Sequence, residues 1–226
     1  MKPPKYHRML EYDRSLLPNA HLQKLEAGVT DIETAVGRSG YSIGHPGWGL
    51  LYHLALCQLD RDQENLIVET GTNQSATTLV LAQALVDSGC AGQVVTIELE
   101  PNNLAIAQQN IGAAGLDSRV TLLEGDAKQL LPEALGQPGV LRLAFLDGSH
   151  LFDDVMTEFN LVLPRLEPDG VVAFDNTWQI AEEGEDQRVN GALKHIEQIH
   201  GGNLINLPFV SWYTPGLALW QRQPAL

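Results

Sequence analysis

The stretch from Leu141 to Trp178, LRLAFLDGSHLFDDVMTEFNLVLPRLEPDGVVAFDNTW, constrains the fold of this chain more than any other. Its first apolar run ends at Asp147, and its second ends at Asp175-Asn176. The apolar residues between the two runs recur at the i, i+3, i+4, i+7 spacing of an amphipathic helix, and they are Phe152, Val155, Met156, Phe159, Val162, Leu163 and Leu166. A Pro-Asp-Gly triplet at 168–170 then indicates a turn. The order strand, helix, strand predicts a βαβ unit with parallel strands.

The rest of the chain repeats this pattern. Three earlier apolar runs are strand-like and stop at acidic residues: Asn65–Val68 before Glu69, Val94–Ile97 before Glu98, and Val120–Leu123 before Glu124 and Asp126. Helical patterns over Thr77–Val86, Asn102–Ala114 and Ala127–Leu135 separate the runs. Because strands alternate with helices, we expect an α/β fold with a doubly wound, mostly parallel sheet of seven strands. The last two β runs, Leu204–Val210 and Leu217–Gln221, predict an antiparallel C-terminal hairpin.

The length and composition favour a single domain over residues 1–226. We expect residues 1–60 to form an N-terminal cap, in which the segment SIGHPGWG at 42–49 is a loop and Leu50–Leu59 is a helix, and residues 61–226 to form the core. Cys57 and Cys90 are too few for a disulfide scaffold, so we expect reduced thiols.

The charge of the chain excludes several kinds of partner. Twenty-eight acidic residues against fourteen basic ones give a net charge of −14, which disfavours binding to nucleic acid or to anionic membranes. The N-terminal segment lacks an apolar signal core, and the longest apolar run is too short to span a bilayer. We therefore expect a cytoplasmic protein.

Five carboxylates end strand-like runs: Glu69, Glu98, Asp126, Asp147 and Asp175. The carboxyl ends of parallel strands meet at one edge of the sheet, where open α/β sheets bind their ligands. Any one of these acids could merely cap a helix. A cluster of five costs free energy unless a cation compensates the charge, so we expect a sulfonium-bearing ligand or a divalent metal there.

From about Asn65 to Gln221 the chain resembles the class I S-adenosylmethionine-dependent methyltransferases, which have a Rossmann-like fold. The segment ETGTNQS at 69–75 stands where that superfamily has its glycine-rich first loop, although Gly71 is the only one of the usual glycines present. The resemblance implies that Glu69 lies near the methionine moiety, Glu98 accepts from the ribose hydroxyls, and Asp126 meets the adenine amino group. The implied cofactor-binding set is Glu69, Gly71, Thr72, Ser75, Glu98, Asp126, Ala127 and Asp147.

Within that superfamily the 141–178 stretch resembles the metal-dependent O-methyltransferases of the catechol and caffeoyl-coenzyme-A types. The resemblance implies that Asp147, Asp175 and Asn176 bind the metal. Those enzymes carry a lysine base three residues after the first aspartate, where this chain has His150. The Asp-Gly-Ser-His sequence is similar to a group that includes macrolide-sugar O-methyltransferases and cephalosporin-cluster homologues, in which the histidine is the base.

The chemistry of these side chains agrees with the resemblance. Two carboxylates and an amide oxygen are hard ligands that suit Mg²⁺, and a metal-bound hydroxyl is acidic enough for a histidine to deprotonate. His45, Trp48 and Trp178 are candidates for lining the acceptor pocket, or else they close the core over the cofactor. The acidic segment Glu182–Asp186 is either a solvated loop or a lid.

The predicted function is methyl transfer from S-adenosylmethionine to a hydroxyl of a small molecule, with Mg²⁺ or another hard divalent cation and His150 as base. One alternative is a metal-independent small-molecule N- or carboxyl-methyltransferase, and a more remote one is a non-catalytic nucleotide-binding protein. A dinucleotide-binding enzyme fits poorly, because ETGTNQS is not G-x-G-x-x-G and the chain has no Tyr-x-x-x-Lys. A homo-oligomer stays open.

Overall fold

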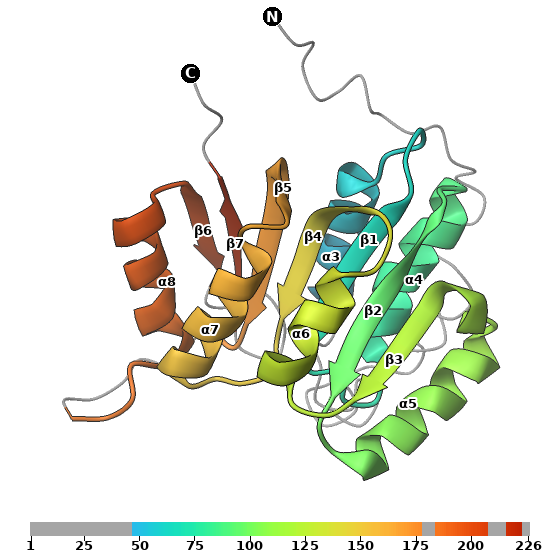
Figure 1. Ribbon diagram of the computed structural model, residues 1–226, viewed down its shortest axis with the longest axis horizontal. Coiled ribbons are helices and arrows are strands. Elements are labelled where there is room, and N and C mark those ends of the chain that lie inside the picture. Colours follow the sequence, from blue (N-terminus) through green and yellow to red (C-terminus); the bar gives the residue numbers. More distant parts are fainter. Residues whose placement is uncertain (1–46, 178–183, 208–215, 223–226) are drawn as a thin grey trace, which may run out of the picture.

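A computed structural model describes residues 47–177, 184–207 and 216–222, and it contains one seven-stranded sheet (Figure 1). The strands are β1 (Asn65–Thr70), β2 (Gly92–Glu98), β3 (Val120–Glu124), β4 (Val140–Leu146), β5 (Leu166–Asp175), β6 (Asn203–Leu207) and β7 (Leu217–Gln221). Their order across the sheet is β3-β2-β1-β4-β5-β7-β6. The five strands β1 to β5 are parallel, while β7 runs antiparallel to β5 and β6 antiparallel to β7. The predicted α/β class and the reversed C-terminal strands are confirmed.

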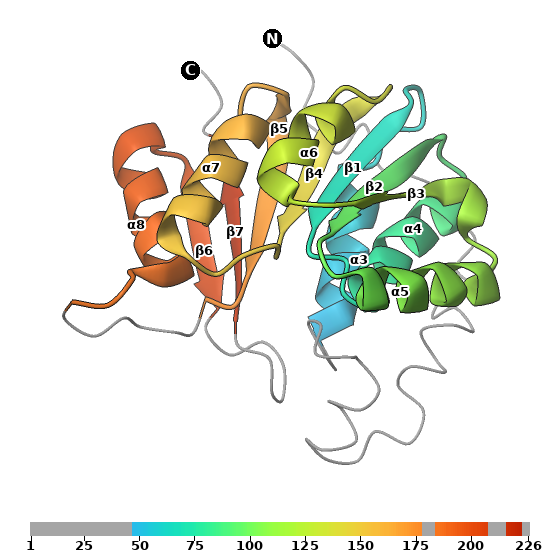
Figure 2. The same ribbon diagram turned by 60° about the horizontal axis from the view of Figure 1, so that its bottom comes forward.

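Helices cover both faces of the sheet, as Figure 2 shows. The helices are α3 (Gly47–Gln58), α4 (Ala76–Ser88), α5 (Pro101–Ala114), α6 (Ala127–Leu135), α7 (Phe152–Val162) and α8 (Arg188–His200), with a 3-10 turn at Asp117–Arg119. One layer contains α3, α4 and α5, and the other contains α6, α7 and α8. No helix in these described segments combines the length and apolar character needed to cross a bilayer.

The alternation of side chains along each strand divides the core into two clusters. Ile67 of β1 packs into the cluster beneath α3 and α4, whereas Leu66 and Val68 pack into the cluster beneath α6, α7 and α8. Since successive strand residues point to opposite faces, Glu69 faces α4 and Thr70 faces α7. Glu69 and Thr70, at the end of β1, therefore contact helices on opposite faces of the sheet.

The structure corrects three sequence-based boundaries. Helix α3 begins at Gly47, so the end of the segment predicted as a loop over 42–49 is helical. Leu166, predicted as the last apolar position of the helix, instead belongs to β5 and pairs with Leu141. The predicted turn at 168–170 lies within β5, where the register against β4 shifts between Leu141 and Leu143. An irregular strand thus took the place of a turn. Both Cys57 and Cys90 are free thiols, as expected.

Candidate active site

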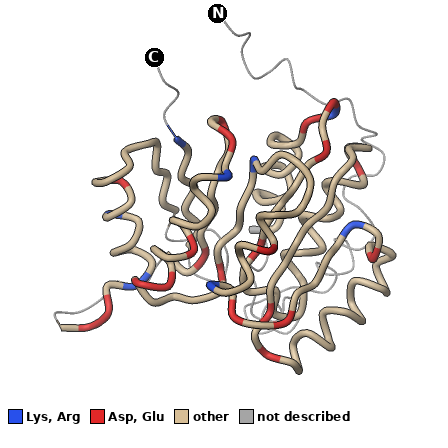
Figure 3. The backbone as a smooth tube through the Cα atoms, viewed as in Figure 1, with Lys and Arg blue, Asp and Glu red and all other residues tan. Residues whose placement is uncertain are grey.

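Acidic side chains gather at the carboxyl ends of the parallel strands. Figure 3 marks Asp and Glu positions in red on the backbone, and several of them lie along the lower edge, where β1 to β5 end. The topology places the β1–β4 pair at the centre of this edge, where the chain order of the strands changes direction. That is the position at which open α/β sheets bind ligands. All five predicted strand-end carboxylates lie at or just beyond the ends of their strands.

A cavity of about 220 Å³ opens at this edge beside β1, β2 and β4. Its lining contains four of the predicted cofactor-binding residues, namely Gly71, Glu98, Asp126 and Ala127. The other lining residues are Ile97, Leu99, Gly125, Lys128, Gly148, Ser149, Asp154 and Glu158. Leu99 is an exposed apolar side chain next to Glu98, so the cavity offers both an apolar wall and a row of acceptors.

Backbone amides hold the two acids of this cavity in place. Glu98 Oε2 accepts from the Asn73 amide at 2.6 Å, and Glu98 Oε1 accepts from the Glu100 amide at 2.8 Å. Asp126 is the N-cap of α6, where its side chain accepts from the Lys128 amide at 2.9 Å. Asp126 is therefore both a helix cap and a wall of the cavity. The capping and ligand-binding interpretations of this residue are compatible.

Three predicted cofactor-binding residues lie behind the cavity wall. Glu69 is fully buried, where it accepts a hydrogen bond from Thr78 of α4, and burial raises the pKa of its carboxyl to about 8. The hydroxyls of Thr72 and Thr96 are 2.6 Å apart and buried. Ser75 has φ +73° and is buried at the start of α4. These residues shape the loop from within the protein.

Gly71 brings the loop after β1 against the loop after β4. Its φ is +79°, and a Cβ on it would lie 2.1 Å from the Asp147 carbonyl oxygen. Both the left-handed backbone and the close approach require glycine. The first loop of the fold therefore touches Asp147 directly.

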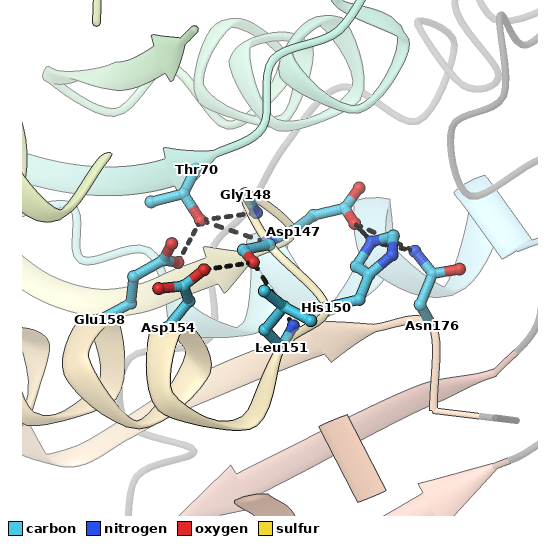
Figure 4. A network of polar contacts seen from close by, with 9 residues as sticks. Thr70, Asp147, Gly148, His150, Leu151, Asp154, Glu158 and Asn176 are labelled. Carbon is cyan, nitrogen blue, oxygen red and sulfur yellow. Dashed lines mark hydrogen bonds and ion pairs between the residues drawn. The ribbon is translucent and has the colours of Figure 1, made fainter. Parts of the chain in front are cut away.

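Asp147, His150 and Asn176 meet beyond the ends of β4 and β5 (Figure 4). His150 Nε2 lies 3.4 Å from Asp147 Oδ1, and the Asn176 amide nitrogen lies 3.3 Å from the same oxygen. The Asn176 nitrogen also lies 2.6 Å from His150 Nε2. Asn176 holds a left-handed backbone with φ +55°, which is uncommon for a residue other than glycine. The sequence-predicted base and two of the predicted metal ligands are thus one cluster.

Asp175 supplies the second carboxylate beside this cluster. It is buried, and its Oδ1 has no hydrogen-bond partner. Burial and the neighbouring Asp147 raise the pKa of Asp175 well above the ordinary value. Burial likewise raises the pKa of Asp147 to about 8. A positive charge beside Asp147 and Asp175 would therefore stabilise the ionised form of both carboxylates.

Comparison with known proteins identifies the fold and the domain. Residues 68–177 match a family model described as a methyltransferase domain. The chain therefore contains a segment, residues 68–177, that is similar to a methyltransferase domain.

Relatives of the domain are named O-methyltransferases. The chain is 35% identical over 137 residues to a catechol O-methyltransferase of Niastella koreensis, covering 58% of this chain and 60% of the relative. It is 34% identical over 140 residues to a catechol O-methyltransferase of Mycobacterium tuberculosis, covering 61% and 60%. The match therefore spans about 60% of the length of each relative.

A solved structure shares the fold over nearly the whole chain. The O-methyltransferase TomG from Streptomyces achromogenes, in complex with SAM, has a TM-score of 0.68 and 24% identity, covering 93% of this chain and 94% of TomG.

The methyltransferase domain offers donors that suit a hard divalent cation. Asp147 and Asp175 supply carboxylate oxygens, Asn176 supplies an amide oxygen after rotation of its side chain, and Asp175 Oδ1 is an orphaned buried acceptor. No three Asp, Glu, His or Cys side chains in the described segments are arranged as a metal-binding group. The donor chemistry fits a cation that takes its remaining ligands from water or from the acceptor.

Several side chains at the site of the methyltransferase domain were missed by the sequence analysis. Thr70 and Glu158 hydrogen-bond behind Asp147, and Lys128, Asp154 and Ser149 form a second chain along the cavity. An acidic residue on the apolar face of the α7 helix was the available signal for Glu158.

Of the remaining sequence-based candidates for the acceptor pocket, Trp48 lies among the described residues. Trp48 is only 1% exposed and packs in the core beneath α3 and α4, which favours its core interpretation over a place in the acceptor pocket. His45 and Trp178 lie outside the described residues. Of the predicted acidic loop or lid, Asp186 accepts hydrogen bonds from the amides of Phe152 and Arg188, so it joins the start of α7 to the start of α8.

Proposed function

We propose that this protein is an S-adenosylmethionine-dependent O-methyltransferase that acts on a small molecule with adjacent hydroxyl groups. The names of the relatives support this acceptor class, because both are catechol O-methyltransferases. The observation that carries the proposal is the meeting of Asp147 Oδ1, His150 Nε2 and Asn176 Nδ2 within 3.4 Å. This cluster adjoins the cavity that contains Glu98 and Asp126.

The cavity supports binding of the cofactor. Glu98 retains free lone pairs for two ribose hydroxyls, because each of its oxygens accepts only one backbone amide. Asp126 stands at the other side for the adenine amino group, and the Ala127 backbone lies beside it. The bound SAM of the structural neighbour TomG is consistent with this assignment.

Asp147, Asp175 and Asn176 would hold a divalent cation. When bound, such a cation lowers the pKa of an acceptor hydroxyl and compensates the charge of the two carboxylates. The buried, unpartnered Oδ1 of Asp175 and the raised pKa values of Asp147 and Asp175 favour this assignment.

His150 would remove the hydroxyl proton through Nε2. Burial lowers the pKa of the imidazole; the negative charge of Asp175 raises it, and the positive charge of Arg188 lowers it further. A lowered pKa keeps the ring neutral near pH 7. The Nε2 lone pair, which lies 2.6 Å from the Asn176 amide nitrogen, would become free to accept a proton when Asn176 rotates its amide oxygen toward the cation. Its side chain is 41% exposed and accessible to an acceptor. The hydroxyl oxygen then forms a bond to the methyl carbon as the carbon–sulfur bond breaks, and S-adenosylhomocysteine leaves.

A direct test uses S-adenosylmethionine with a deuterated methyl group and detects the product by mass spectrometry. We expect transfer to 3,4-dihydroxybenzoate but little transfer to 4-hydroxybenzoate, a matched acceptor that lacks the second hydroxyl. Treatment with EDTA should stop the reaction and Mg²⁺ should restore it. Full turnover in EDTA would instead support a metal-independent methyltransferase. Calorimetry that detects no binding of S-adenosylhomocysteine would refute the cofactor assignment.

A further inference from the structure

A chain of hydrogen bonds, buried at its Thr70–Glu158 end, lies behind the turn that carries Asp147 (Figure 4). Thr70 Oγ1 donates to Glu158 Oε2 at 2.7 Å, across 88 residues of sequence. The same Thr70 oxygen accepts from the amides of Asp147 and Gly148, each at 3.1 Å. This hydrogen-bond chain therefore links α7, the end of β1 and the turn after β4.

Glu158 determines which way this chain is oriented. A threonine hydroxyl has one proton and two lone pairs. While Glu158 accepts the proton, both lone pairs of Thr70 point to the two amides, and the polarised hydroxyl becomes a stronger acceptor. Without an acceptor at position 158 the hydroxyl is free to rotate, and its proton then competes with the amides.

The position of Glu158 is unfavourable for a carboxylate that serves only packing. The side chain is 2% exposed on the buried face of α7, between Val155 and Phe159. Burial raises the pKa of its carboxyl to about 7, and neighbouring Asp154 and Asp126 raise it too. An apolar side chain of similar volume would avoid this desolvation penalty.

The hydrogen-bond chain holds the turn after β4, whose geometry the proposed reaction requires to be fixed. Asp147 begins the turn, and His150 follows three residues later with Nε2 at 3.4 Å from Asp147 Oδ1. Fixing the amides of Asp147 and Gly148 fixes the start of this turn. Glu158 also borders the cavity beside Gly148, so the same side chain adjoins the cofactor pocket.

We infer that Glu158 is a positioning residue which, through Thr70, holds the turn that carries Asp147 and His150 in its reactive arrangement. The inference rests on the proposed function for its kinetic consequence. It does not depend on that function for its structural consequence, the protection of two backbone amides.

Two pairs of matched variants test the kinetic consequence. Glu158→Met and Thr70→Val remove the acceptor and the hydroxyl, and each should lower kcat about 10–100-fold at saturating cofactor. Glu158→Gln and Thr70→Ser keep an acceptor oxygen and a hydroxyl, and each should stay within about threefold of the wild type, since the hydrogen bond is retained. Full activity of Glu158→Met, with thermal unfolding unchanged, would overturn the inference.

The double variant Glu158→Met/Thr70→Val shows whether the two residues act through one hydrogen-bond chain or independently of each other. If both residues act through the same hydrogen bonds, the double variant should lose no more than the worse single variant. Multiplied losses would overturn the inference.

Hydrogen exchange tests the same chain without any turnover. The amides of Asp147 and Gly148 should exchange faster in Thr70→Val and Glu158→Met than in Thr70→Ser and Glu158→Gln. A wild-type protein that transfers no methyl group but shows this exchange pattern would refute the proposed function and leave the positioning role standing. Unchanged exchange in all four variants would refute the positioning role alone.

Discussion

The acids on the two sides of the carboxyl edge of the sheet have different hydrogen-bond partners. At the β2–β3 side, Glu98 accepts from two backbone amides and Asp126 accepts from one. At the β4–β5 side, the Asp147 carboxylate lies 3.3–3.4 Å from His150 and Asn176 side-chain nitrogens, and Asp175 Oδ1 has no partner. On the β2–β3 side both acids accept hydrogen bonds from backbone amides of the protein, whereas on the β4–β5 side the buried Asp175 Oδ1 accepts none.

This difference indicates two modes of ligand binding. Acids that already accept hydrogen bonds from backbone amides are suited to binding neutral hydroxyl and amino groups. Such donors require a correctly oriented acceptor and do not require an opposite charge. Asp147 and Asp175 suit a cation, because a metal ion offsets both the desolvation and the repulsion that raise their pKa values. One sheet edge thus combines the proposed cofactor site with the proposed cation site.

The largest expected effect lies on the β4–β5 side. His150→Ala should lower kcat about 10²–10⁴-fold, the range for loss of a positioned general base. Its affinity for S-adenosylhomocysteine should not change, because His150 does not line the cofactor cavity. His53→Ala, which alters an exposed histidine on α3, is the matched control for steady-state kinetics. If kcat does not change, His150 is not the base.

On the β2–β3 side the effect should appear in binding. Glu98→Gln removes the charge that strengthens hydrogen bonds from the ribose hydroxyls, and we expect calorimetry to show a roughly 10–100-fold loss of S-adenosylhomocysteine affinity. At saturating cofactor, kcat should stay near the wild-type value. Glu124→Gln, at the exposed end of β3, is the control. A lower kcat with normal affinity would remove the distinction between the two sides.

The smallest effect concerns stability and comes from Glu69. Its carboxyl pKa is raised from 4.5 to about 8, so the folded protein keeps a proton that the unfolded chain releases above pH 4.5. The free energy of unfolding should therefore fall as the pH rises from about 4.5 to about 8. Glu69→Gln removes this contribution and keeps an acceptor for Thr78. Its melting temperature should fall less between pH 5 and pH 8 than that of the wild type, by at least about 2 °C.

The buried acids at Asp147, Asp175 and Glu158 shift in the same direction as Glu69, so the variant should flatten the pH dependence only in part. A melting curve for Glu69→Gln that follows the wild type at every pH would show that Glu69 stays charged in the folded protein.

Local sequence patterns predicted most of the fold because strand and helix periodicities depend on near neighbours. The Ala127–Leu135 helix matches α6 at both ends. Leu166 was misplaced because its helical spacing from Val162 and Leu163 is a local signal, whereas its strand pairing with Leu141 is a contact 25 positions away that no local pattern contains. The register of β5 against β4 shifts where the Pro-Asp-Gly triplet at 168–170 lies, and this triplet predicted a turn because it does not show the continued pairing with β4.

The candidate site was predicted as residue types but not as contacts. The strand-end position of Asp147 and the Asp-Asn pair at 175–176 placed these residues correctly at one edge. The resemblance implied that Glu69 lies near the methionine moiety, and this stays a prediction; the structure shows its buried carboxyl accepting from Thr78 of α4. Thr70 and Glu158 were missed because their contact depends on how α7 packs on β1, which follows from tertiary structure alone.

Gly71 has a consequence for how the side chains of this site can vary. The loops after β1 and β4 touch through main-chain atoms, with the position of a Cβ only 2.1 Å from the Asp147 carbonyl oxygen. At position 71 the approach of the two loops is therefore set by main-chain atoms, and the Thr70 hydroxyl adds two hydrogen bonds to the same turn. Substitutions elsewhere in the two loops can change which acceptor fits the proposed site, whereas any side chain at position 71 would push the loops apart.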